Sequence, residues 1–196
     1  MAIANITILR RGAIYDSLEK VELTDVRSGA TVARVSQANA GLIRRDVGRL
    51  DAAHATLRRL SAAELCDICR RAGELFMRAA LPVGEGESQT PQQYIEALSA
   101  TSGLPYALCG RNMAKINTVL TEMATILGGL TRGLDLAAID TGHAQHHGIP
   151  VSFYPTTQTL GIVLPSNSPG VNSIWLPTVA LKIPVVVKPG RDCLLY

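Results

Sequence analysis

The stretch that decides the fold is LGIVLPSNSPGVNSIWLPTVALKIPVVVKPGR, which runs from Leu160 to Arg191. It opens with a short apolar run without charge, which predicts a strand buried on both faces. A cluster of turn formers follows, and apolar positions at helical spacing then predict a helix from Val171 to Lys182. Pro184 stops that helix, and the valines that follow predict a second buried strand. Strand, helix and strand of this length predict a right-handed βαβ crossover, the unit of a parallel sheet.

Two turns of this unit are candidates for a binding site, because ligands bind parallel sheets at the carboxyl ends of the strands. PSNSPG follows the first strand and KPGR follows the second. Asn167 in the first turn has two interpretations, as the N-cap of the next helix or as an amide that donates to a developing oxyanion. Lys188 in the second turn is either a solvated lysine or a cation that meets a ribose or phosphate. The residues alone leave both pairs of alternatives open.

The chain before this unit is predominantly helical. Alternating residues predict a hairpin over 19–36, and an apolar stripe predicts one amphipathic helix over 38–60. Further helices are expected over 61–79, 90–102 and 108–127, the first two with N-terminal capping residues. In the helix over 61–79 the apolar face is expected to include Ile68, Cys69 and Leu75. The segment from Gly128 to Gly133 lacks the strand and helix that flank a phosphate loop, so we interpret Gly128–Gly129 as the end or a kink of the preceding helix.

Composition excludes several classes of protein. The chain has 196 residues and a net charge of +3, and no basic run exceeds two residues, so we expect no nucleic-acid surface. No apolar run approaches membrane-spanning length, and the N-terminus does not resemble a signal peptide, so we expect no membrane association. Four cysteines in such a chain do not form a disulfide framework, which favours a cytoplasmic protein. Cys66-x-x-Cys69 and the histidines at 143, 146 and 147 are expected to be core and loop residues, without metal.

At the two turns the chain resembles the aldehyde dehydrogenase superfamily. Members carry a strand that ends in P-x-N-x-P, a helix that finishes in a segment like A-L-K, and a strand that reads V-V-x-K-P. Those segments stand here at 165–169, 179–182 and 186–189. The resemblance follows the whole chain in the order of its elements, but only the stretch from Leu160 to Arg191 in sequence detail. It implies an α/β fold in which a helical N-terminal half leads into the first βαβ of a parallel Rossmann-like sheet.

The resemblance also implies roles for residues at the turns. Asn167 would stabilise the oxyanion of a thiohemiacetal intermediate, and NAD or NADP would contact both turns. The implied cofactor-binding residues are Leu164, Pro165, Ser166, Asn167, Lys188, Gly190 and Arg191. Two positions depart from the family pattern, because Ser166 replaces a frequent aromatic residue and Arg191 replaces a glutamate that holds the ribose diol. A cation there suggests tolerance of a phosphate, as in NADP or the nucleotide of coenzyme A.

By the same resemblance, the chain divides into four parts. These are an N-terminal hairpin arm (1–36), the helical part of the cofactor-binding domain (37–142), an extended connector suited to oligomerisation (143–159), and the truncated first βαβ of the nucleotide-binding sheet (160–196). The family's nucleophilic cysteine and glutamate base come from the second half of a chain more than twice as long. No cysteine here sits in such a motif. We therefore expect a fragment or truncated product that has no dehydrogenase turnover by itself.

The leading hypothesis is the N-terminal part of an NAD(P)-dependent aldehyde dehydrogenase-like oxidoreductase. Its substrate would be a small aldehyde or acyl compound, and the full-length protein would be a homo-oligomer. An acylating aldehyde dehydrogenase or acyl-CoA reductase is the alternative within the family, and Ser166 with Arg191 favours it. A non-catalytic interaction module is the alternative from a different class. A reading frame that continues beyond Tyr196 to a catalytic cysteine would separate the enzyme from the module.

Overall fold

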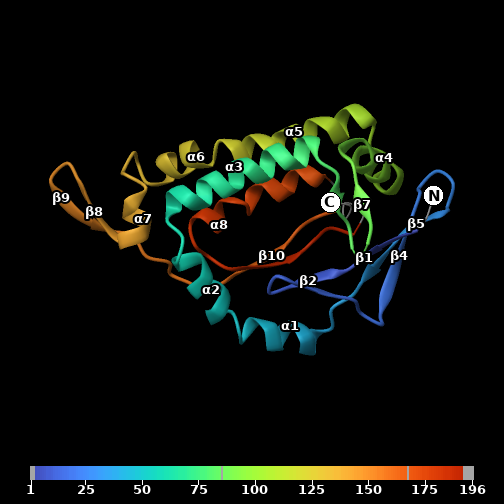
Figure 1. Cartoon of the computed structure of the whole chain (residues 1–196), viewed down its shortest axis with the longest axis horizontal. Helices are drawn as coiled ribbons and strands as arrows, with labels where there is room; N and C mark the ends of the chain where they lie inside the picture. The colour runs from blue at the N-terminus through green and yellow to red at the C-terminus, as the bar shows by residue number, and fades with distance from the viewer. Residues whose placement is uncertain (1–2, 85, 167, 192–196) are drawn as a thin grey trace.

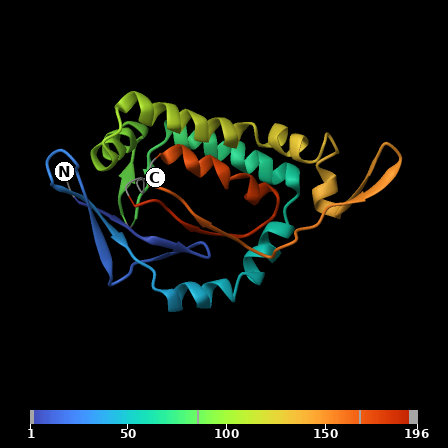
Figure 2. The same cartoon turned by 180° about the vertical axis from the view of Figure 1, so that it is seen from behind.

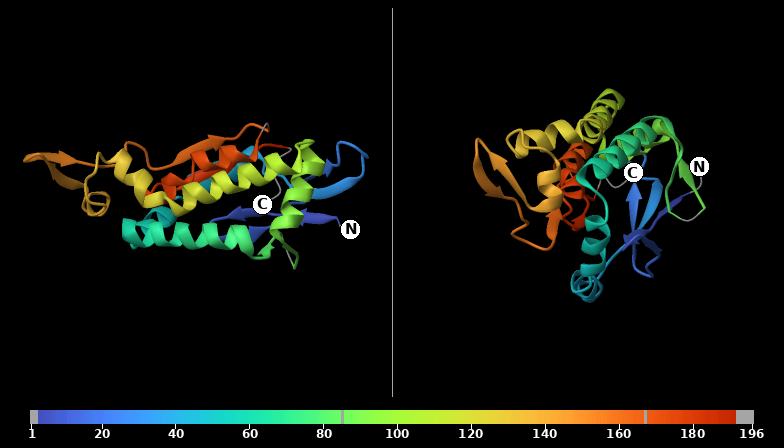
Figure 3. Two further views of the ribbon diagram at one scale, coloured as in Figure 1. Left: turned by 90° about the horizontal axis from the view of Figure 1, so that it is seen from above. Right: turned by 60° about the vertical axis from the view of Figure 1, so that its left-hand side comes forward.

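Two long helices, α3 (Ala62–Arg78) and α5 (Tyr106–Thr121), run side by side over short strands in the computed structural model of the chain (Figures 1 and 3). The structure describes residues 3–84, 86–166 and 168–191. The helices pack closely because α3 has a glycine at the contact: a Cβ on Gly73 would lie 2.9 Å from the side chain of Asn117. The largest core cluster lies between these two helices, α6 (Met123–Leu130) and α8 (Pro177–Ala180). Its buried members are Leu65, Cys66, Cys69, Ile116, Leu120, Met123, Leu127 and Ala180.

Local capping signals begin α3 and α4 (Pro91–Ser102) where the sequence predicts. The Ser61 hydroxyl accepts from the Glu64 backbone N–H at 3.1 Å, and the Glu64 carboxylate accepts from the Ser61 N–H at 2.7 Å. Thr90 and Gln93 form the same reciprocal pair at the start of α4, with Pro91 as the first helical residue. Both helix starts are therefore confirmed. The predicted apolar face of α3 is partly wrong, since Ile68 and Leu75 are exposed and Cys66 is buried instead.

Two predicted helices are each divided in two. The stretch over 38–60 forms α1 (Ala40–Val47) and α2 (Asp51–Arg58), and neither contains a fully buried residue. Farther along, α5 ends at Thr121 and α6 (Met123–Leu130) follows after Glu122. Gly128 and Gly129 lie inside α6, so the prediction that they end or kink the preceding helix is wrong. The chain leaves the helix at Arg132 and Gly133, which have positive φ values, and the Gly133 N–H donates to the Gly128 carbonyl at 2.7 Å.

The N-terminal strands form a small mixed sheet in the order β1-β5-β4. β4 (Lys20–Thr24) and β5 (Thr31–Ser36) are the antiparallel pair that the alternation predicts. β1 (Ala4–Ile6) pairs with β5 in parallel, which the sequence did not indicate. A neighbouring hairpin of β2 (Ile8–Arg10) and β3 (Ala13–Tyr15) turns at Arg11 and Gly12, both with positive φ. The sheet buries Leu23, Ala33 and Val35 against Ala97 of α4.

Two further hairpins and a short helix complete the first part of the chain. β6 (Leu81–Pro82) and β7 (Ser88–Gln89) form a brief antiparallel pair after α3. After α6, the chain passes through α7 (Ala137–Thr141) into β8 (His143–His146) and β9 (Ile149–Ser152). This last hairpin projects away from the other elements, as Figure 2 shows. No helix among the described residues is long and apolar enough to cross a membrane.

The last elements form the predicted parallel unit. β10 (Leu160–Val163) pairs with β11 (Val185–Lys188) in parallel, so that Leu160 lies opposite Val185 and Val163 opposite Lys188. The single helix predicted between them is wrong, because a 3₁₀ helix, η1 (Pro169–Ile174), precedes the short α8, which begins at Pro177. Burial of β10 on both faces is also wrong, since Val163 is 76% exposed. Among the described residues β11 is the one strand that pairs with β10, so the result is an α/β fold with an incomplete Rossmann-like sheet.

Candidate functional site

The turns that follow β10 and β11 meet at the carboxyl ends of the two strands. The Leu164 N–H donates to the Lys188 carbonyl at 2.9 Å, which continues the strand pairing by one bond. Beyond it, the Arg191 N–H donates to the Ser166 hydroxyl at 2.6 Å. The first bond spans 24 residues of sequence and the second, which joins the PSNSPG and KPGR segments directly, spans 25. The described residues of both predicted turns are therefore brought together.

Gly190 allows the two turns to approach each other this closely. A Cβ built on it would lie 2.4 Å from the Pro165 carbonyl oxygen and 2.9 Å from the Ser166 Cα. Real Cβ atoms essentially never come within 3.0 Å of such atoms. No side chain larger than hydrogen fits here without moving backbone, which gives Gly190 a packing role at the base of the site.

The surface above this contact is polar and basic. Pro165, Ser166, Lys188 and Arg191 are exposed, whereas Leu164 is buried beneath them. Within the described ranges, the one hydrogen bond of the Lys188 ammonium is a long contact of 3.4 Å to the carbonyl of the next residue. Among the described residues neither Lys188 nor Arg191 forms an ion pair, so both cations are available to a negatively charged or hydroxyl-rich ligand.

Asn167 lies outside the described residues, but the residues after it are well anchored. Ser168 is the N-cap of η1, where its hydroxyl accepts from the Gly170 N–H at 3.3 Å. The N-cap position of η1 is thus held by Ser168, and both interpretations of Asn167 concern a residue outside the described ones. The same hydroxyl donates to the Asn112 Oδ1 on α5 at 3.2 Å. A Cβ on Gly170 would lie 2.5 Å from that oxygen, so α5 supports the turn directly.

Asn112 is the residue of this region that sequence reasoning missed. It lies 56 residues before Ser168, in the middle of a helix, and no motif surrounds it. The one available signal is a polar residue beside the buried Met113 on a helix that also packs against η1. Its amide oxygen ties the turn to the helical layer, and it can position the turn without touching a ligand.

The cysteines that the structure describes do not resemble nucleophiles. Cys66, Cys69 and Cys109 are free and buried, and burial raises the pKa of each thiol above its ordinary value. A nucleophilic thiol needs the opposite shift, toward the thiolate. Cys193 lies outside the described residues. The histidines at 143, 146 and 147 belong to the β8–β9 hairpin, and no three potential metal ligands gather anywhere in the described part of the chain.

The fold of the chain is similar to that of known proteins. The chain has the α/β fold of the N-terminal portion of aldehyde dehydrogenases, although no family model and no curated protein matches its sequence. Proline utilization A from Bdellovibrio bacteriovorus superposes on 97% of the chain with a TM-score of 0.75 and 12% identity. NADP-dependent glyceraldehyde-3-phosphate dehydrogenase from Bacillus halodurans, complexed with NADP, also covers 97%, with a TM-score of 0.71 and 14% identity.

A third similar structure is succinate-semialdehyde dehydrogenase from Burkholderia pseudomallei, which covers 98% of the chain with a TM-score of 0.69 and 16% identity. The chain spans 18% of the proline utilization A chain and 38% of each of the other two. It therefore corresponds to a limited part of these proteins, and identities this low establish the fold alone.

Proposed function

We propose that this chain is the part of an NAD(P)-dependent, aldehyde dehydrogenase-like oxidoreductase that holds the cofactor and stabilises the oxyanion. The observation that carries the proposal is the meeting of the two turns at the carboxyl ends of β10 and β11, in a fold shared with aldehyde dehydrogenases. In open parallel sheets this is where nucleotide ligands bind.

The residues present fit a dinucleotide. Lys188 has an exposed ammonium that would donate to ribose hydroxyls, and Pro165 and Ser166 offer an exposed backbone edge that would line the cofactor. Arg191 is an exposed cation next to this edge and would meet a phosphate, which favours NADP over NAD. Leu164 and Gly190 hold the floor of the site by the strand bond and the close backbone contact. When bound, the nicotinamide supplies a hydride acceptor.

Asn167 has the proposed role in the chemistry itself. Attack of a thiolate on an aldehyde carbonyl places negative charge on the carbonyl oxygen, and a preorganised amide N–H stabilises that charge. The anchoring of Ser168 by Asn112 supports this role, because a donor is effective only when it is already in position. The attacking cysteine would come from a part of the protein outside this chain, since the three described thiols are buried.

Substitution of Asn167 tests the proposal in a full-length protein that contains this chain. Asn167→Ala should lower turnover about a hundredfold, the cost of one oxyanion donor, with little change in cofactor affinity. Asn39→Ala is the matched control, because Asn39 caps the exposed helix α1 and its loss should affect stability alone. Unchanged turnover in Asn167→Ala would reject the oxyanion role.

An acylating activity is the second candidate, and the exposed Arg191 beside Ser166 favours it, because coenzyme A carries a nucleotide phosphate. Turnover of the full-length protein that requires coenzyme A, or that reduces an acyl-CoA, would establish this activity. Turnover of a free aldehyde to a carboxylate without coenzyme A would exclude it in favour of the hydrolytic reaction.

Assembly and location follow from the same proposal. We infer that the full-length protein is a cytoplasmic homo-oligomer that associates through the β8–β9 hairpin, whose Ile149 is 66% exposed. Light scattering of the full-length protein and of a variant with Ile149→Lys would test this, because a charge in an apolar interface should shift the assembly toward the monomer.

A further inference from the structure

A pocket of about 280 Å³ lies away from the two turns, between α2, α7, the segment after β9 and the end of α8. Its volume is close to the lower end of the range for small-molecule sites and equals roughly nine water molecules. The lining residues are His54, Arg58, Ile139, Asp140, Thr141, Gly142, Phe153, Tyr154, Pro155, Leu181 and Lys182. Basic groups and apolar surface thus line one cavity.

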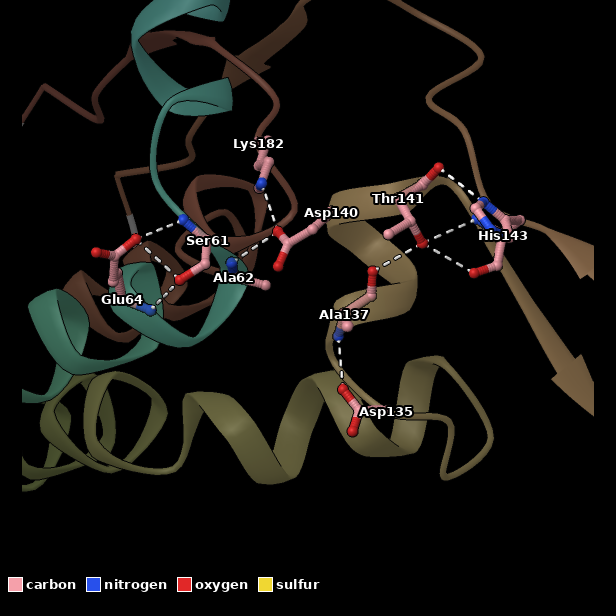
Figure 4. A network of polar contacts seen from close by, with 9 residues as sticks. All are labelled: Ser61, Ala62, Glu64, Asp135, Ala137, Asp140, Thr141, His143 and Lys182. Carbon is pink, nitrogen blue, oxygen red and sulfur yellow. Dashed lines mark hydrogen bonds and ion pairs between the residues drawn. The ribbon is translucent and has the colours of Figure 1, made fainter.

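Lys182 is the buried charge of this pocket. The residue is 8% exposed, and its backbone has a positive φ of 61°, which directs the side chain back toward α7. Its ammonium pairs with Asp140 Oδ1 at 2.5 Å, and the same oxygen accepts the Ala62 N–H at the start of α3 at 2.8 Å (Figure 4). An ammonium has three N–H donors, and among the described residues Asp140 is the one partner of Lys182. Two donors of a buried cation therefore remain for a ligand.

Two further basic groups lie on α2. His54 and Arg58 stand one helical turn apart and both line the pocket. Neither side chain has a hydrogen-bond or ion-pair partner in the described part of the chain. Asp140 is the single carboxylate in the lining, and its charge is balanced by Lys182. The pocket therefore has a net positive charge that is carried by Arg58.

Five of the remaining lining residues are apolar or aromatic. Phe153 is fixed to the end of α7, because its N–H donates to the Gly142 carbonyl at 2.8 Å. The apolar lining residues are Ile139, Phe153, Tyr154, Pro155 and Leu181. An inorganic ion would leave this surface without a contact, whereas an organic anion with a short hydrocarbon part would cover it.

We propose that the pocket binds a small organic carboxylate, whose oxygens meet Arg58 and Lys182 and whose hydrocarbon part lies against the apolar wall. Binding is noncovalent and does not depend on the cofactor site, so this inference stands apart from the proposed function. Arg58 supplies two parallel donors to the carboxylate and Lys182 adds a desolvated charge.

Calorimetric titration of the full-length protein with sodium butyrate tests the proposal, with butyramide as a neutral ligand of the same size. Butyrate should bind and butyramide should bind at least tenfold more weakly, because it lacks the charge that both cations recognise. Arg58→Gln should weaken butyrate binding at least tenfold. Arg59→Gln is the matched control, because Arg59 is the exposed C-cap residue that follows α2 and does not line the pocket. This substitution should leave the affinity unchanged.

Arg58 is exposed and unpaired among the described residues, so its substitution should not impair folding, and equal melting temperatures for the two variants would verify this. The proposal is overturned if butyrate does not bind at millimolar concentration, or if butyramide binds equally well. It is also overturned if Arg58→Gln and Arg59→Gln weaken butyrate binding to the same extent. Loss of cofactor binding in a Lys188 variant would leave it unaffected.

Discussion

Substitution of Gly190 by alanine is the most direct test of how the two turns are held together. The new Cβ would lie 2.4 Å from the Pro165 carbonyl oxygen, whereas real Cβ atoms keep at least 3.0 Å, so the turns must separate by at least 0.6 Å (3.0 − 2.4). The neighbouring atoms belong to the backbone and cannot rotate away. Overpacking of this kind costs about 1–3 kcal/mol, which corresponds to a fall of about 2–12 °C in the melting temperature of a chain this size.

Gly161→Ala is the matched control because Gly161 belongs to β10 of the same parallel pair. A Cβ there meets no atom within 4 Å. The control should therefore leave the melting temperature unchanged or raise it, since alanine has fewer unfolded conformations than glycine. Neither glycine has a positive φ, so the difference between the variants reports the contact alone.

Thermal unfolding by circular dichroism measures the stability of both variants, and fluorescence titration with NADP measures cofactor affinity in the full-length protein. Gly190→Ala should weaken cofactor binding as well as lower the melting temperature, because the substitution displaces Ser166 and Arg191 relative to each other. If Gly190→Ala and Gly161→Ala have equal melting temperatures and equal cofactor affinities, the close contact of the two turns does not hold the site together.

Two further predictions concern the elements around the site. Asn112→Ala should lower the free energy of unfolding by about 1 kcal/mol and slow turnover of the full-length protein, because the turn loses its hydrogen bond to α5. Asn112→Asp keeps the acceptor oxygen and should restore most of the turnover; equal losses in both variants would contradict the positioning role. The Arg10 guanidinium, bonded to Asp46 at 2.6 and 2.7 Å, holds the pKa of that carboxyl below its usual range. The ion pair should therefore stabilise the fold above about pH 4 and lose its effect as the pH falls through the lowered pKa. The melting temperature of Asp46→Asn should lie below that of the wild type at pH 7, and the two melting temperatures should converge in acid. A difference in melting temperature that does not depend on pH would refute the pairing.

Local signals in the sequence predicted much of the secondary structure. Ser61 with Glu64, and Thr90 with Pro91, identified two helix starts because a capping box needs only residues within one turn. The parallel pairing of β10 and β11 followed from two apolar runs of crossover spacing. The predicted extent of the helix between them was wrong, because the periodicity of apolar residues does not indicate the break before Pro177.

Contacts between distant segments could not be predicted in this way. The exposure of Val163 depends on which elements lie beside β10. An apolar run in the sequence predicts a strand but does not show whether another element covers it. The left-handed backbone at Lys182 is unusual for a residue with a side chain, and no neighbouring residue signals it. Its partner Asp140 lies 42 residues earlier and binds Ala62, which is 78 residues from it.

The sequence by itself determined which residues of the candidate site would lie at strand ends, because a strand followed by a turn is a local property. Only the tertiary structure decided how those turns meet. The Arg191 N–H donates to the Ser166 hydroxyl, 25 residues away in sequence, and Gly190 leaves room for the Pro165 carbonyl. Asn112 supports the first turn from 56 residues away. The physical reason is the same in each case. The contact forms only after helices and strands have packed, so no single stretch of sequence predicts it.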